Sequence, residues 1–102
     1  LDDIRAFVTA HPDIDGIVAA SDVIANSAIR ALTEAGRRVP DEVSIVGYDD
    51  IELASYAHPP LTTVRQDLAE GARLLVERVL SGETNVAQSV AMTPALIIRQ
   101  SS

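Results

Sequence analysis

The chain has 102 residues, 47% of them hydrophobic, and its 8 basic and 15 acidic side chains give a net charge of −7 at pH 7. This length suits one small domain with a packed core, and so acidic a surface repels nucleic acids and anionic membranes. The sequence has no cysteine and no lysine, because all of its basic residues are arginine. Disulfides, thiol catalysis, Schiff-base chemistry and phosphate-loop lysines are therefore excluded within it.

No apolar run is long enough to span a bilayer, and the start Leu1-Asp2-Asp3 lacks the basic and apolar blocks of a signal peptide. Because the first residue is leucine and the only methionine is Met92, we expect a piece of a longer protein. His11 and His58 are far apart and each precedes a proline, which is typical of loop histidines. The sequence thus predicts no metal site, no cofactor and no membrane partner.

The first half of the chain predicts a βαβ unit. Its expected elements are a helix over 1–10, a strand over 16–20, a helix over 23–35 and a strand over 43–47. The run 16–20 is continuously apolar, which indicates a strand buried on both faces, as in a parallel sheet. Ser21 and Asp22 are both good N-caps, and Gly36 is placed to end the helix. Strand, helix and strand in this order form a right-handed unit.

The second half begins with a mixed segment over 51–60, to which the pattern assigns no element. A weaker, β-branched strand is expected over 61–65, and Asp67 can cap a helix over 68–80. A turn-rich stretch over 82–88 leads to a last strand over 95–99. The predicted fold class is α/β, a parallel sheet flanked by helices.

Polar side chains follow three of the predicted strands: Ser21-Asp22, Tyr48-Asp49-Asp50 and Arg65-Gln66. In open α/β sheets, ligands bind at the carboxyl ends of parallel strands, so these groups are expected to line one edge. Hydroxyl, carboxylate, guanidinium and amide groups together suit a neutral polyhydroxylated ligand.

Each of these groups also has a purely structural interpretation. Ser21 and Asp22 can simply cap the following helix, and the two aspartates at 49 and 50 can form a solvated turn. Gln66 can be a loop amide, and Arg65 an exposed charge.

Enzyme chemistry is disfavoured at this edge. Asp22 with Asp49 and Asp50 suggests a magnesium site of a phospho-accepting domain, but that site also needs a lysine. Adjacent carboxylates on one strand point to opposite faces, which disfavours sugar hydrolysis, and no nucleophile with a base and an orienting group is present. We therefore expect no enzyme.

Four stretches carry recognisable motifs. Residues 16–32 read GIVAASDVIANSAIRAL, 36–51 read GRRVPDEVSIVGYDDI, 59–66 read PPLTTVRQ and 93–102 read TPALIIRQSS. In order and spacing they resemble motifs of the lactose-repressor/galactose-repressor family of bacterial transcription regulators. The resemblance implies part of an effector domain with the two-lobed, type I periplasmic-binding-protein-like fold, incomplete in this chain.

The resemblance also implies a division of the chain. Residues 1–66 would form the C-terminal lobe, 67–94 a hinge crossing and a helix of the N-terminal lobe, and 95–102 the final strand and tail. Operator DNA would be bound by an N-terminal helix-turn-helix that this sequence does not contain.

By motif, Asp49 matches the family's carboxylate that accepts hydrogen bonds from ligand hydroxyls or a base edge. Gln66 matches a hinge amide that reaches the ligand in many members. Ser21 stands beside Asp22 where the family usually has asparagine, which removes an NH₂ donor and points to a different effector contact. These four residues are the effector-binding candidates, for a sugar or a nucleoside-like ligand.

The family also forms homodimers through this lobe. The apolar candidates for that contact are Ile24, Ala28, Ile29, Ile51, Leu53 and Tyr56. A position of Ile24 and Ala28 in the lobe's own core is the alternative.

The resemblance thus implies a cytoplasmic, ligand-responsive transcription repressor. A periplasmic sugar-binding protein of a transporter is the alternative, since it shares the fold and a carboxylate like Asp49. The motif at residues 59–64 favours the repressor.

Overall fold

A computed structural model describes residues 1–82 and 92–102. The elements are α1 (Asp2–Ala10), β1 (Gly16–Val18), α2 (Asp22–Glu34), β2 (Ser44–Val46), α3 (Glu52–Tyr56), β3 (Thr63–Arg65), α4 (Leu68–Leu80) and β4 (Ala95–Ile97). The predicted helices and strands are all present, although each strand is shorter than expected, at three residues. Of the predicted turn-rich stretch at 82–88, residues 83–88 lie outside the described residues.

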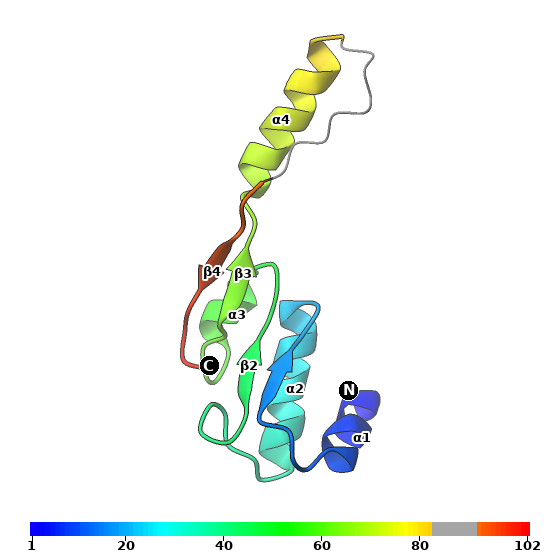
Figure 1. Ribbon diagram of the computed structural model, residues 1–102, viewed down its shortest axis with the longest axis vertical. Helices are drawn as coiled ribbons and strands as arrows, with labels where there is room; N and C mark the ends of the chain where they lie inside the picture. Colours follow the sequence, from blue (N-terminus) through cyan, green and yellow to red (C-terminus); the bar gives the residue numbers. More distant parts are fainter. Residues whose placement is uncertain (83–91) are drawn as a thin grey trace.

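The strands form two two-stranded sheets, β1 with β2 and β3 with β4, which lie next to each other along the molecule (Figure 1). β1 and β2 pair in parallel, with Ile17 opposite Ile45, which confirms the βαβ unit. Val46 forms a parallel bridge with Thr62 just before β3, and β4 then pairs antiparallel with β3. The carboxyl ends of β2 and β3 therefore meet at the same edge.

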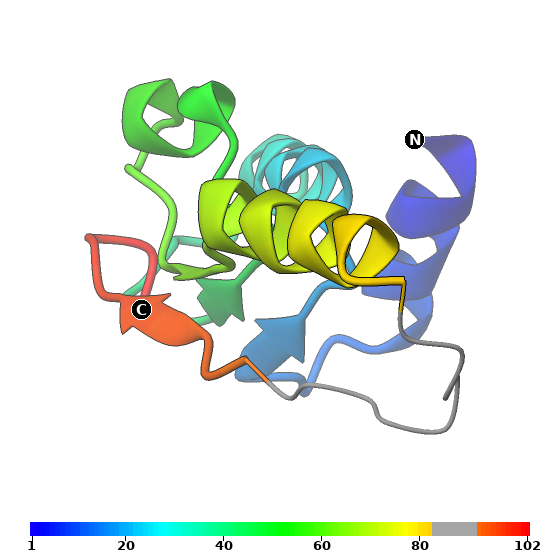
Figure 2. The same ribbon diagram turned by 90° about the horizontal axis from the view of Figure 1, so that it is seen from above.

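The hydrophobic core lies on one side of these strands. Seen along the long axis, α2 and α3 lie on the same side of β1, β2 and β4 (Figure 2). Leu32 of α2 is fully buried, and it belongs to the same cluster as Val43, Ile45 and Leu61. The helical stripe of α2 and the inward residues of the strands thus build the core together.

The prediction that residues 16–20 are buried on both faces is wrong. Ile17 and Ala19 face the core, whereas Val18 is 85% exposed. The reason is that the described helices cover only one face of the strands, so alternate side chains of the apolar run are left open.

Helix α3 lies in the segment to which the sequence pattern assigned no element. It spans five residues, and no side chain caps its N-terminus at Ile51. Ala54 is its buried residue and joins the core. Without a cap or a repeated apolar stripe, so short a helix leaves no local signal.

Helix α4 projects beyond the rest of the chain (Figure 1). It begins as predicted, with the Asp67 carboxylate accepting from the Glu70 amide at 3.0 Å, but none of its residues is buried. The radius of gyration is 17.6 Å, against about 13 Å for a compact domain of 100 residues. The large apolar residues of α4 that are exposed are Leu68, Leu75, Val76, Val79 and Leu80. α4 therefore extends the molecule without adding to the core.

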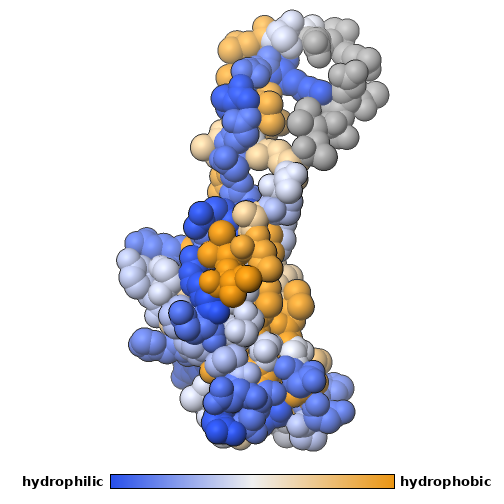
Figure 3. Space-filling model, turned by 60° about the vertical axis from the view of Figure 1, so that its left-hand side comes forward, coloured by the Kyte–Doolittle hydropathy of each residue, from blue (hydrophilic) through white to orange (hydrophobic). Residues whose placement is uncertain are grey.

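A second apolar patch lies at the height of β4 (Figure 3), where Leu96 and Ile98 are exposed. Within the described ranges, every helix is too short or too polar to cross a membrane.

Candidate functional site

Ser21 stands at the junction of β1 and α2 and has an extended backbone, with φ −153° and ψ 162°. Its hydroxyl oxygen accepts a hydrogen bond from the Ile24 amide at 3.2 Å. The structural interpretation of Ser21 as an N-cap is thus confirmed. The side chain is half-buried, so the cap and a contact with a ligand do not exclude each other.

The loop after β2 is held between α2 and β3. The Asp22 amide donates to the Tyr48 carbonyl, and the Asp49 amide donates to the Val64 carbonyl, both at 2.9 Å. The polar groups that follow β1, β2 and β3 therefore meet at one edge, as expected. Asp49 itself is exposed and has a φ of 106°.

Asp22 is enclosed beneath this loop, with 1% of its surface exposed. One carboxylate oxygen accepts from the Thr63 hydroxyl at 2.5 Å and the other accepts from the Ile51 amide at 2.9 Å. Gly47 makes room for it, because a Cβ at that position would lie 2.3 Å from Asp22 Oδ1. Among the four candidates, Asp22 is the one that the structure turns inward, and its contacts hold the loop together.

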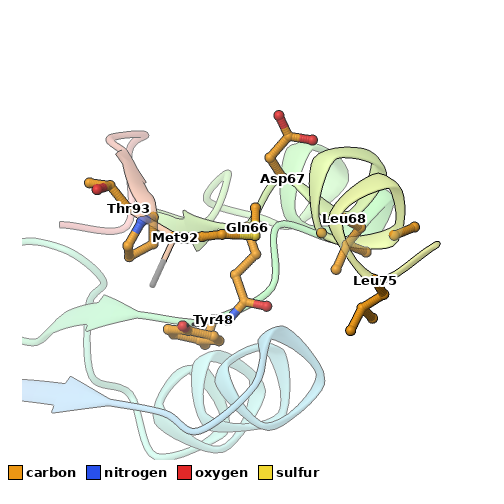
Figure 4. A pocket seen from close by; sticks show the side chains of 10 residues that line it. Tyr48, Gln66, Asp67, Leu68, Leu75, Met92 and Thr93 are labelled. Atoms are coloured by element: carbon orange, nitrogen blue, oxygen red, sulfur yellow. Dashed lines mark hydrogen bonds between the residues drawn. The ribbon is translucent and has the colours of Figure 1, made fainter. Parts of the chain in front are cut away.

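Gln66 follows β3 and is exposed. Its side-chain amide donates to the Tyr48 hydroxyl at 2.7 Å, so it reaches across from β3 to the loop after β2. Figure 4 shows Gln66 pointing toward Tyr48, whereas the Asp67 carboxylate points away from it. The amide is therefore oriented toward the edge where Asp49 lies.

A groove of about 560 Å³ opens beside Gln66, between the Tyr48 loop and the first turns of α4 (Figure 4). Its lining is Tyr48, Gln66, Asp67, Leu68, Gly71, Ala72, Leu75, Met92, Thr93 and Pro94. Of the candidate residues, it includes only Gln66. Ser21, Asp22 and Asp49 lie outside its lining, so the described residues do not enclose all the candidates in one cavity.

Asp50 differs from its neighbour, because only 7% of its side chain is exposed. Its two carboxylate oxygens accept from Arg65 Nε at 2.6 Å and from Arg99 Nη2 at 2.9 Å. Burial pushes the pKa of Asp50 upward, but the hydrogen bonds from the two guanidinium groups outweigh it and hold the pKa below its ordinary value.

Sequence reasoning treated Arg65 as an exposed charge and gave Arg99 no role. Arg99 lies 49 positions from Asp50, so no local spacing signals their contact.

The apolar candidates for a dimer contact fall into two groups. Ile24, Ile51, Leu53 and Tyr56 are exposed, Tyr56 at 70%. Ala28 and Ile29 are buried in the core, at 3% and 4% exposure, so the assignment of these two to an interface is wrong. The helical stripe of α2 turns them toward the strands.

No cluster of three or more histidine, cysteine, aspartate or glutamate side chains suited to a metal ion occurs among residues 1–82 and 92–102. The edge is thus a set of hydrogen-bonding groups around an exposed carboxylate.

The chain has clear relatives. The family model of the periplasmic binding protein-like domain matches residues 1–102. The HTH-type transcriptional regulator CelR of Thermobifida fusca is 41% identical over an alignment 102 residues long. The alignment covers 96% of this chain and 30% of that protein. The chain therefore spans less than a third of that relative's length.

Two solved structures are similar throughout the chain. A complex of transcriptional regulator CelR with cellobiose has a TM-score of 0.82 at 40% identity, covering 97% of this chain and 31% of the other. The Lac repressor dimer bound to operator and the anti-inducer ONPF has a TM-score of 0.89 at 32% identity, covering 99% of this chain and 36% of the other. The expected fold class and the resemblance to lactose-repressor relatives are confirmed.

Proposed function

The chain belongs to the family of periplasmic binding protein-like domains, and from that membership we propose that it is the effector-binding part of a ligand-responsive transcription repressor. The observation that carries the proposal is the exposed carboxylate of Asp49, on a loop held between α2 and β3. The protein would be cytoplasmic and would act by binding, without catalysing a reaction.

The ligand we propose is a small polyhydroxylated molecule, a sugar or a nucleoside-like compound. Asp49 would accept hydrogen bonds from ligand hydroxyls, and the Gln66 amide and Ser21 hydroxyl would complete the contacts. Asp22 would not contact the ligand but would hold the loop of Asp49 in place through its hydrogen bonds with Thr63 and Ile51. The cellobiose complex of CelR supports a sugar ligand.

The division of the chain supports the same function. Residues 1–66 would be the C-terminal lobe, because the buried hydrophobic core comes from them. Residues 67–94 would be a hinge crossing and a helix of the N-terminal lobe, since α4 extends away and buries none of its side chains. Residues 95–102 would be the final strand and tail. The operator would be bound by a helix-turn-helix outside this sequence, because the relative CelR is an HTH-type transcriptional regulator.

The proposal is tested in the intact protein by titration calorimetry with cellobiose, lactose, sucrose, ribose and adenosine. We expect one of these ligands to bind and to change the affinity for DNA from the promoter of the protein's own operon. Asp49→Ala should weaken ligand binding by at least about 10-fold, because it removes hydrogen bonds to a charged group.

The same variant should bind the promoter DNA as wild type does. Asp41→Ala is the matched control. Asp41 is also an exposed carboxylate, but it lies before β2, whereas Asp49 lies after it. Undiminished response to the ligand in Asp49→Ala would overturn the proposal.

A homodimer is the second part of the proposal. The exposed side chains Ile24, Ile51, Leu53 and Tyr56 come from α2 and from α3 with its preceding residue. The Lac repressor dimer supports the same state here. Tyr56→Glu in the intact protein should shift sedimentation velocity toward the monomer, and a dimer as stable as wild type would contradict this assignment.

A further inference from the structure

The loop that presents Asp49 has an unusual backbone. Asp49 and Asp50 are consecutive non-glycine residues with positive φ, at 106° and 51°. Each such residue costs about 1–3 kcal/mol and persists only where its surroundings fix it.

Backbone hydrogen bonds supply part of that fixation. The Asp49 amide donates to the Val64 carbonyl at 2.9 Å, and the Asp50 amide donates to the Thr63 hydroxyl at 3.3 Å. The Ile51 amide donates to Asp22 at 2.9 Å. Three successive amides are thus bound to β3 or to α2.

The Asp50 side chain supplies the rest. Its oxygens accept from Arg65 at 2.6 Å and from Arg99 at 2.9 Å, and Arg99 also donates to the Leu61 carbonyl at 2.9 Å. Charge-assisted hydrogen bonds to a nearly buried carboxylate are stronger than those between neutral groups. Asp50 is therefore anchored from two directions.

The two arginines lie at the two strands that lead to α4 and back from it. Arg65 is the last residue of β3 and directly precedes Gln66, and Arg99 follows β4. In Figure 1, β3 and β4 lie side by side where the chain leaves the core toward α4. One carboxylate thus links the end of β3 and the residues after β4 to the loop of Asp49.

From this arrangement we infer that Asp50 is a positioning residue for ligand binding. Its carboxylate holds the left-handed turn, so that Asp49 points outward and keeps its position relative to Gln66, which follows β3. The inference rests on the proposed function of Asp49 and Gln66 in binding a ligand.

The first test needs no ligand. Hydrogen–deuterium exchange of the intact protein compares wild type with Asp50→Asn, because asparagine tolerates the same left-handed backbone but lacks the charge and one of the two acceptor oxygens. Amides of residues 48–51 should exchange about 10-fold faster in the variant. Arg65→Gln, at a largely exposed position, should have a smaller effect in the same direction.

Glu34→Gln is the matched control. Glu34 also binds two arginines, Arg5 at 2.7 Å and Arg30 at 3.0 Å, but it lies at the end of α2 rather than beside the loop. It should leave the exchange of residues 48–51 unchanged. Unchanged exchange in Asp50→Asn would overturn the inference, whatever the ligand is.

The second test is a double-mutant cycle on the affinity for the compound of the calorimetric panel that wild type binds. Asp50→Asn should weaken binding about 10-fold alone and less than about 2-fold in the Asp49→Asn background. A purely structural role would weaken binding equally in both backgrounds, and that result would overturn the inference. If wild type binds no member of the panel, the proposed function fails, and the exchange experiment still decides whether Asp50 holds the turn.

Discussion

The carboxylate of Asp22 accepts a hydrogen bond of 2.5 Å from the hydroxyl of Thr63, a residue 41 positions further along the chain. Its second oxygen accepts from the Ile51 amide. One buried side chain therefore joins the start of α2, the loop after β2 and the start of β3. The candidate site is built on this junction.

Replacing Asp22 should destabilise the fold. Asp22→Ala leaves the Thr63 hydroxyl and the Ile51 amide without their partner, and we expect a loss of about 2–4 kcal/mol. Urea unfolding of the intact protein measures this loss, with Asp41→Ala as the control that should stay within about 0.5 kcal/mol of wild type. Equal stability of the two variants would contradict the role of Asp22 as a structural junction.

Gly47 should resist substitution for a related reason. A Cβ at this position would lie 2.3 Å from Asp22 Oδ1 and 3.0 Å from Leu61 Cδ2. Gly47→Ala should therefore cost at least about 2 kcal/mol in the same urea experiment, because neither neighbour is free to move. Gly16→Ala is the control, since the nearest atom to its Cβ is the Ser44 carbonyl oxygen at 4.0 Å. A similar, small loss of stability at both glycines would show that the side chains of Asp22 and Leu61 can move aside.

Sequence reasoning succeeds here where the signal is local. The starts of α2 and α4 follow from the capping side chains of Ser21 and Asp67, whose partners lie three residues away. The edge site follows from the polar residues after each strand, because parallel strands share an edge.

Other features depend on distant residues. The sequence around Asp22 looks like a cap, but its burial depends on Thr63, and the role of Asp50 depends on Arg99. The open face of Val18 depends on which elements cover the sheet, a property that the apolar run itself does not encode.

Ser21 separates a stability effect from a binding effect. Ser21→Ala removes the acceptor of the Ile24 amide and should cost about 1 kcal/mol, whereas Ser21→Asn keeps a good N-cap and should stay within about 0.5 kcal/mol. The asparagine adds an NH₂ donor, so we expect Ser21→Asn to change which compounds of the calorimetric panel the protein prefers. An unchanged preference would place Ser21 outside the ligand contacts.

Acid should weaken the fold partly through Asp50. Its pKa is lowered in the folded state relative to an ordinary value of 3.8, so the unfolded chain takes up the proton first as the pH falls. The stabilisation is present above the unfolded pKa and is lost as the pH falls through the lower folded pKa. The stability of wild type should therefore decrease more steeply than that of Asp50→Asn between about pH 5 and pH 3, measured by urea unfolding. Parallel pH profiles would contradict the ion pairs of Asp50.

The exposed apolar residues of α4 should make the 102-residue chain associate when it is produced alone. Leu75 and Val79 are 70% and 80% exposed, and monomers rarely leave such patches uncovered. Light scattering should show dimers or larger species, and Leu75→Glu with Val79→Glu should reduce them. Arg73→Gln, on the charged face that pairs with Glu70 and Glu77, is the control. A monodisperse wild-type monomer would contradict this prediction.

The positive φ of Asp50 also restricts how this position can evolve. Asparagine and glycine accept the left-handed backbone but provide no anion for Arg65 and Arg99. Glutamate keeps the charge on a longer side chain that disfavours this backbone. Aspartate alone meets both demands, so we expect a lineage that replaces it to replace the two arginines as well, and substitutions at these three positions to be correlated.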